Sequence, residues 1–282
     1  MLNSDSSPLI AVPPSRRRTL WPIWVVAALL VIVPFWSWYS TWFGRKLSDA
    51  EITQYLSGSE KPRKMQHALL QIEQRIIARD ANVKQWYPQI AALKNNALPE
   101  IRVTAAWVMG QDNTSDSFHQ ALLEMLADSQ PLVRRNAALG LVRFADARGH
   151  AELLAMLKPY TIQAPRAGTV TTQLKEEQSI APDILVARIK LNGAEVLEVR
   201  SPLPGKISAI KVEKEAKVNA GDDLIVLSPD QKHILESLRA LSLIGLPDDL
   251  PEVERYARGV EGMSDNIKRQ AALTAEAIRK RQ

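Results

Sequence analysis

The stretch SPLPGKISAIKVEKEAKVNAGDDLIVL, residues 201–227, decides the fold because an earlier segment repeats its pattern. The offset between the two copies is 37 residues at first and 38 after a one-residue gap. The matched positions, first copy then second, are Ala164 and Ser201, Pro165 and Pro202, Gly168 and Gly205, Val170 and Ile207, Ile180 and Val218, Val186 and Leu224, and Ile189 and Leu227. A duplicated strand–turn–strand pattern predicts a small β module built from two similar halves.

The residue types within each copy are those of short strands and tight turns. Pro165 and Pro202 cannot donate to a sheet ladder, so they are expected at strand entries or edges. Asn192-Gly193 lies between the apolar runs 184–191 and 196–199, which is the strongest short signal for a two-residue hairpin. The two copies are therefore expected to be joined by a bare turn.

The duplicated unit resembles the two halves of a biotinyl/lipoyl-type barrel-sandwich hybrid domain. That family includes acyl-carrier domains and the periplasmic adaptor (membrane fusion) proteins of bacterial export machines. The family pattern from Val212 onward would have glycines at two positions of each copy. Glu215 replaces the first Gly while Gly221 keeps the second, and the earlier copy has Glu177 and Asp183 at these positions. A plain β insert without this relationship is the alternative.

The hairpin tip distinguishes a carrier from an adaptor. The resemblance implies that a carrier would hold its modified Lys at the tip, where this chain has Ala194. Lys190 is nearby but precedes the turn, in the strand. Without an amine at the tip there is nothing to acylate, so no cofactor is predicted. Adaptors insert a long helical hairpin between the half-motifs, and this chain has only the turn.

Residues 19–43 carry no charged side chain and are long enough for a helical bilayer crossing, which takes about 20 apolar residues. Tryptophans gather at both ends of this segment, as interface anchoring predicts. We therefore expect a single-pass transmembrane helix, with burial in a soluble core as the alternative. Residues 1–18 are expected to be a disordered tail. Its three consecutive arginines, residues 16–18, favour a cytoplasmic N-terminus with the bulk of the chain in the periplasm.

Helical periodicity fills residues 47–158 and 230–282 on either side of the module at 160–228. Pro99 followed by Arg102 and an Ala pair recurs as Pro131 followed by Arg134 and an Ala pair, with a period near 32. After the module the pattern returns around Lys268, and the turn at 245–249 is expected to join the two helices of this last repeat. Such paired helices resemble HEAT repeats. The predicted fold is thus α+β, a HEAT-like α-solenoid interrupted by a barrel-sandwich module, with a generic bundle as the alternative.

Arg102, Arg134 and Lys268 recur at one repeat position and could line a surface for an acidic partner. The competing interpretation is that they make structural bonds between repeats. His119 and His150 also occupy equivalent positions, and a metal site there would need Asp116 or Glu152. Solvated helix-start positions are the better explanation, so no metal site is predicted.

Composition excludes several function classes. The chain has no cysteine, which excludes disulfides, thiolate zinc sites and Cys nucleophiles, and its formal net charge of +5 is mild for 282 residues. Nucleic-acid binding would need a concentrated basic patch with stacking aromatics, and none is visible. No catalytic motif is found, so no catalytic residue is predicted.

The resulting hypothesis is a non-enzymatic, membrane-anchored scaffold or adaptor for other envelope or membrane proteins, possibly in a transport assembly. The alternative is a degenerate biotinyl/lipoyl carrier, or a modification factor of the kind represented by the HEAT-like bilin-attachment lyases.

Overall fold

The computed structural model describes residues 21–41, 45–58, 61–171, 175–191 and 195–281. They fall into two compact units, of which the first ends at Lys46 and the second begins at Leu47. The predicted disordered tail at residues 1–18 and the hairpin tip with Ala194 lie outside the described residues.

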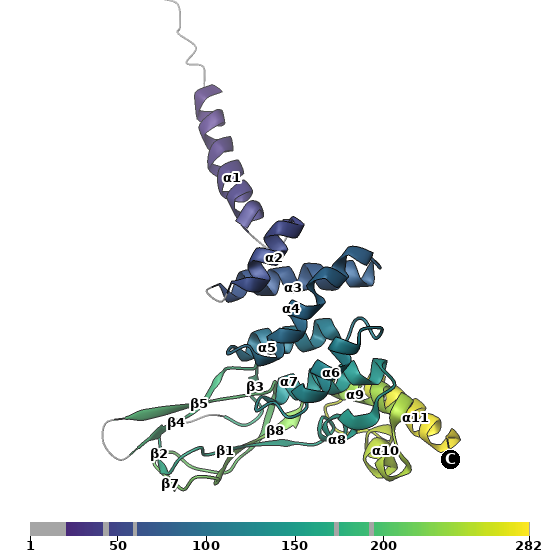
Figure 1. Ribbon diagram of the computed structural model, residues 1–282. Coiled ribbons are helices and arrows are strands. Elements are labelled where there is room, and N and C mark those ends of the chain that lie inside the picture. The colour runs from purple at the N-terminus through teal and green to yellow at the C-terminus, as the bar shows by residue number, and fades with distance from the viewer. Residues whose placement is uncertain (1–20, 42–44, 59–60, 172–174, 192–194, 282) are drawn as a thin grey trace, which may run out of the picture. The chain divides into compact units, whose positions relative to one another are not determined.

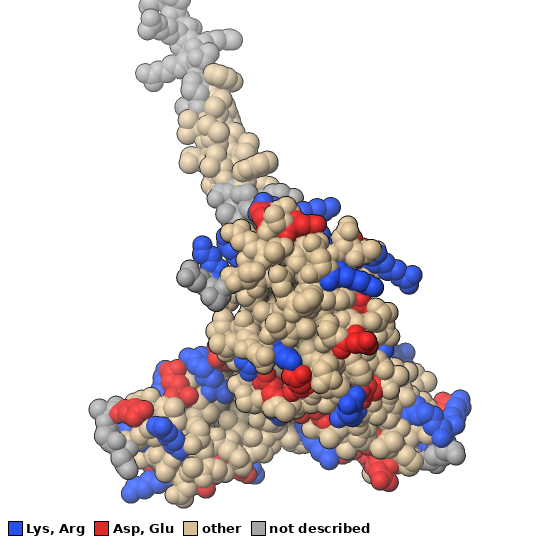
Figure 2. All heavy atoms as spheres, viewed as in Figure 1, with Lys and Arg blue, Asp and Glu red and all other residues tan. Residues whose placement is uncertain are grey.

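The described part of the first unit has one helix, α1 (Trp21–Thr41), which includes Pro34. Its described side chains are apolar and exposed, among them Trp24, Leu30 and Val31. Figure 2 shows this helix without Lys, Arg, Asp or Glu. In the part of the chain that the structure describes, no helix is both long and apolar enough to cross a bilayer. The transmembrane helix predicted for residues 19–43 is therefore not supported by the structure.

The second unit is built on helix pairs (Figure 1). The first helices of the successive pairs are α2 (Asp49–Ser57), α4 (Tyr87–Ala92), α6 (Asp116–Met125), α8 (His150–Ala155) and α10 (Leu250–Arg258). The second helices are α3 (Pro62–Ile77), α5 (Pro99–Met109), α7 (Pro131–Arg143), α9 (Gln231–Ile244) and α11 (Asp265–Lys280). Short 3-10 turns are η1 (Ala81–Trp86), η2 (Leu93–Asn95), η3 (Ala147–Gly149) and η4 (Pro247–Asp249). Each second helix contacts the next, so together they form one layer, which we call the second-helix layer.

Helix α7 connects the two halves of the helical core. Ala137 and Leu141 lie in the apolar cluster of α2 to α6, whereas Ala138 and Val142 lie in the cluster of α8 to α11. Small residues allow this close packing. A Cβ on Gly149 would lie 2.7 Å from Ala138 Cα, so the start of α8 needs glycine to reach α7. Both faces of α7 are thus buried, and the stack is continuous through it.

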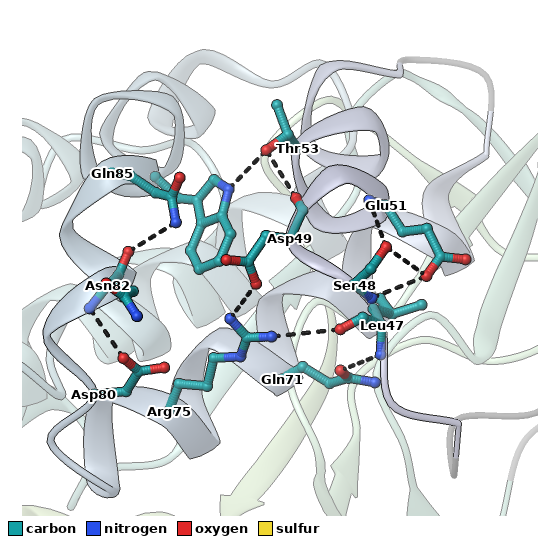
Figure 3. Close-up of polar contacts among 11 residues, drawn as sticks. Leu47, Ser48, Asp49, Glu51, Thr53, Gln71, Arg75, Asp80, Asn82 and Gln85 are labelled. Atoms are coloured by element: carbon teal, nitrogen blue, oxygen red, sulfur yellow. Dashed lines mark hydrogen bonds and ion pairs between the residues drawn. The ribbon is translucent and has the colours of Figure 1, made fainter.

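The beginning of the second unit is held by a polar network around Arg75, on α3 (Figure 3). Arg75 donates to Asp49 Oδ1 at 2.7 Å and to the Leu47 carbonyl at 3.3 Å. Ser48 and Glu51 form a reciprocal capping box at the start of α2. These bonds fix the chain to the first helix pair directly after the boundary between the two units.

The β module lies between α8 and α9 and consists of two four-stranded antiparallel sheets. The strand orders are β1-β8-β6-β3 and β5-β4-β2-β7. The strands are β1 (Tyr160–Gln163), β2 (Gly168–Val170), β3 (Ser179–Ile180), β4 (Leu185–Lys190), β5 (Val196–Arg200), β6 (Gly205–Ile210), β7 (Lys217–Val218) and β8 (Asp223–Pro229). Among the described residues both sheets stay open, so the predicted barrel does not close.

The duplicated positions form the core between the two sheets. Val170, Ile180, Val186 and Ile189 of the first copy are buried in one cluster with their second-copy equivalents. Burial of the same positions in both copies explains why the sequence repeats. The predicted hairpin is also present as an antiparallel pairing of β4 with β5, although its tip is not described.

The β module is inserted within one helix pair. Strand β1 pairs antiparallel with β8, with Tyr160 opposite Leu227, so the chain enters and leaves the module at adjacent points. Helix α9 then packs on α8 as its partner. The module therefore interrupts one helix pair between its two members. The turn at residues 245–249 joins α9 to α10, not the two helices of the last pair as predicted.

Candidate functional site

The repeated arginines Arg102 and Arg134 make equivalent contacts. Arg102 Nη1 donates to the Asn96 carbonyl at 2.9 Å, and Arg134 Nη1 donates to the Asp128 carbonyl at 2.8 Å, six residues upstream in both cases. Each also reaches the next helix pair: Arg102 binds both carboxylate oxygens of Asp128, at 2.6 and 2.9 Å, and Arg134 Nε lies 3.0 Å from Glu152 Oε2. These contacts tie consecutive pairs together.

The Arg102–Asp128 pair is mostly buried, with side-chain exposures of 12% and 8%. Burial alone would raise the pKa of Asp128. The hydrogen bond from Arg102 and that from the Gln130 N–H outweigh burial, together with the charges of Arg102 and Arg134, so the pKa of Asp128 is lowered. The bidentate geometry is the strong form of this interaction. The pair therefore stabilises the joint between α5 and the loop that precedes α7.

Lys268 differs from the two arginines. It is exposed on α11 and makes no ion pair within the described residues. Its aliphatic stem and Nζ lie against Gly259, at the end of α10. The structure thus separates the recurring cations: two are engaged in contacts between helix pairs, and one is free to face a partner.

The equivalent residues His119 and His150 also have equivalent partners. Nε2 of His119 lies 2.7 Å from Asp146, and Nε2 of His150 lies 2.7 Å from Asp249. In both cases the carboxylate follows the second helix of the same pair. Among the described residues no group of three His, Asp or Glu side chains could hold a metal ion. Each histidine–aspartate contact therefore joins the two helices of one pair. The α8–α9 pair has this contact although the β module is inserted between its two helices.

Two buried hydroxyl groups form hydrogen bonds between the helices after the module and the residues before it. Ser237 Oγ, on α9, donates to the Leu153 carbonyl at 2.6 Å, and Tyr256 OH, on α10, donates to the Leu157 carbonyl at 2.6 Å. Both acceptors belong to the last residues before the module, and both hydroxyls come after it. The helices that follow the module are thus hydrogen-bonded to the residues that precede it.

A buried charged cluster lies at the same place, and sequence reasoning did not find it. Arg135 is 4% exposed, and its Nε makes no hydrogen bond to any described group. Its Nη1 lies 3.4 Å from Nδ1 of His233, while Glu152 Oε1 is 3.7 Å from its Nε. Burial, with the charge of Arg135, lowers the pKa of His233 to about 4. His233 is therefore neutral at neutral pH, so its Nδ1 can accept a hydrogen bond from Arg135.

The β module keeps an unusual backbone at all four positions where the resembling family has glycine. Glu177, Asp183 and Glu215 have φ values of 67°, 63° and 67°, and Gly221 has a φ of 90°. Left-handed backbone is costly for residues with a Cβ. Residues with a Cβ therefore hold left-handed backbone at three of these four positions. Lys190 is exposed at the end of β4, opposite Val196.

A groove on the second-helix layer is a further feature that sequence reasoning missed. It has a volume of about 310 Å³ and is formed by α5, α7 and α9. Trp107 is 39% exposed at one side and Leu243 is 66% exposed at the other. The lining includes Gly110 and Gly140, which each follow an Ala pair, at different spacings.

Comparison with known proteins supports the helical repeats. The family model for HEAT repeats matches residues 88–164, from α4 to β1. No curated protein matches the chain. One similar solved structure is a single-chain, multi-domain long-chain acyl-CoA carboxylase, at 15% sequence identity and a TM-score of 0.25. The match covers 45% of this chain and 15% of that one.

Proposed function

We propose that the chain is a non-enzymatic scaffold or adaptor that holds another envelope protein. The observation that carries this proposal is the open second-helix layer of the continuous stack. Large apolar side chains are exposed on four of its helices: Leu70 and Ile77 on α3, Trp107 on α5, Leu243 on α9 and Leu273 on α11. Apolar surface that recurs along one layer is typical of a protein-binding face.

The proposal includes a membrane anchor at residues 19–43, with the N-terminus in the cytoplasm and the second unit in the periplasm. Its support is the absence of charged residues from this segment and the exposure of the apolar side chains of α1. Cysteines introduced at Ser57 and Lys280 of the cysteine-free chain test the topology. Both should react with a membrane-impermeant maleimide in intact spheroplasts. Labelling only after the spheroplasts are lysed would refute the orientation.

We further propose that the β module is a biotinyl/lipoyl-type barrel-sandwich domain used for binding, without an acyl group. The matched buried positions of its two copies and the left-handed backbone at the four glycine positions support this relationship. A carrier or a modification enzyme is the competing class. Intact-mass measurement separates them, because acylation of Lys190 would add the mass of a biotinyl or lipoyl group.

The function itself is tested by purifying the full chain from its native membranes in mild detergent. A scaffold should co-purify with one envelope protein in near-stoichiometric amount, at an unmodified mass of the chain. A chain that elutes alone, or that carries an acyl group on Lys190, would contradict the scaffold hypothesis.

A further inference from the structure

We propose that the groove between α5 and α9, lined by Trp107, Leu139, Arg143, Arg239 and Leu243, binds an acidic amphipathic segment of the partner protein. We call it the α5–α9 groove. This proposal rests on the scaffold function and specifies its partner. The occupant is identified by two properties of the lining: preformed apolar walls, and arginines without carboxylate partners.

The Trp107 wall of the groove is held in place by a hydrogen bond. The indole Nε1 of Trp107 donates to Glu73 Oε1 at 2.6 Å, which orients the ring at the α5 side. Leu243, on α9, is the most exposed apolar residue of the lining. Leu139, on α7, is half-buried between them. An apolar side chain that entered here would remove exposed surface of Trp107 and Leu243 from water, which is the main favourable term of association.

The groove exists because two glycines meet on its floor. A Cβ on Gly110 would lie 2.9 Å from Gly140 Cα, so Gly110 cannot carry a side chain without a backbone shift, and a Cβ on Gly140 would lie 3.3 Å from Gly110 Cα. The close approach of α5 and α7 leaves their shared surface free of side chains at this point. The floor is therefore lower than the Trp107 and Leu243 walls.

The charges of the lining favour carboxylates. Arg143 donates only to neutral acceptors, the Gly110 carbonyl at 3.1 Å and Gln111 Oε1 at 2.7 Å. Arg239 is exposed, and neither arginine has a carboxylate within 4.0 Å among the described residues. Glu236 is the acidic residue of the lining; it lies 3.8 Å from Lys232, and burial raises its pKa.

The two arginines therefore leave the groove with a net positive charge, and each has donors to spare. Partner carboxylates placed beside them would gain charge-assisted hydrogen bonds. A single segment with apolar residues between Asp or Glu residues satisfies both features of the groove at once. The phosphate of a lipid headgroup could also neutralise the two arginines. The experiment must therefore distinguish a cross-link to lipid from a cross-link to protein.

The test places a photoreactive amino acid at Leu243 in the full chain, expressed in the cells that naturally make it. The matched control carries it at Lys84, which is exposed on η1 and lies outside the second-helix layer and the groove. After irradiation, mass spectrometry maps the cross-linked segment. The expected result is a protein segment with carboxylates beside apolar residues, joined to position 243 and not to position 84.

The double variant Arg143→Gln with Arg239→Gln should lower the yield of this cross-link about tenfold, the loss expected for two partly exposed ion pairs. Arg239→Gln alone should lower the cross-link yield in part. Because Arg239 is exposed, this variant should fold like the wild type. A cross-link to lipid, to a basic segment or to no specific protein would overturn the proposal, as would a yield that is indifferent to both variants.

Failure of the groove and failure of the scaffold function are distinguishable. If the partner co-purifies equally with the wild type and with the double variant, the scaffold function stands and the groove is wrong. If nothing co-purifies with the wild type, the scaffold function itself fails.

Discussion

Removing the two hydroxyls that bridge the insertion should destabilise the entire helical stack. Ser237 and Tyr256 are buried, with exposures of 0% and 1%, and each donates to a carbonyl of the last residues before the β module. The variants Ser237→Ala and Tyr256→Phe delete these donors with little change of shape. They test whether α8 and α9 are two members of one cooperative pair.

The magnitude follows from what each carbonyl loses. The Leu153 carbonyl keeps a bond from the Met156 N–H at 3.2 Å, so Ser237→Ala should cost about 1 kcal/mol. The Leu157 carbonyl keeps a bond from Arg255 Nη2 at 3.0 Å, so Tyr256→Phe should cost about 0.5–1 kcal/mol. At about 2–4 °C per kcal/mol for a unit of this size, the double variant should melt about 3–8 °C lower.

The assay is thermal unfolding of the full chain in detergent, followed by far-UV circular dichroism. Ser242→Ala is the matched control, because the Ser242 hydroxyl donates to the Arg239 carbonyl within α9 at an exposed position and its loss should cost less than about 0.5 kcal/mol. The account requires that the double variant shifts one helical transition as a whole. Two transitions, of which only one moves, would refute the continuity of the stack across the module.

Three further outcomes are expected from urea unfolding. Arg102→Ala should cost about 2–3 kcal/mol, because it leaves the mostly buried Asp128 carboxylate unpaired; a cost below about 0.5 kcal/mol would make the contact incidental. The stability advantage of the wild type over Asp128→Asn should be full above the ordinary pKa of 3.8 and fade as pH falls through the lower folded value, since the folded pKa is depressed; an advantage that grows on acidification would have the wrong sign. Glu215→Gly should stabilise the module by about 0.5 kcal/mol, because glycine relieves the left-handed backbone, whereas Glu213→Gly should not.

The helical repeats could be predicted from sequence wherever each second helix keeps its pattern. Pro99 and Pro131 begin α5 and α7, and the Ala pairs that follow pack between helices. Helix α9 has neither feature: Asp230 caps it, and Leu238 fills the buried position. Because the module and this atypical helix follow each other, the sequence pattern did not show that α8 and α9 form one pair.

The β module shows a similar division. The buried positions of its two copies were predictable because apolar residues recur at one spacing. The left-handed backbone at Glu177 and Glu215 was not, because acidic residues rarely adopt it and tertiary context must impose it.

The α5–α9 groove was even harder to predict from the sequence. Trp107 and Leu243 are more than 130 residues apart in sequence and are brought to one surface only by the packing of α5, α7 and α9. The recurrence of Arg102 and Arg134 was visible in the sequence, but their contacts between helix pairs required the structure.

The central claim is that the β module is an insertion in one continuous HEAT-like stack. The most direct test replaces residues 160–228 with a short Gly-Ser linker and measures thermal unfolding by far-UV circular dichroism. Tyr160 and Leu227 lie opposite each other in paired strands, so the linker has to span only about 5 Å. We predict that the shortened chain keeps its helical signal and unfolds in a single transition. Loss of the helical signal, or separate transitions for the helices before and after the linker, would contradict the claim.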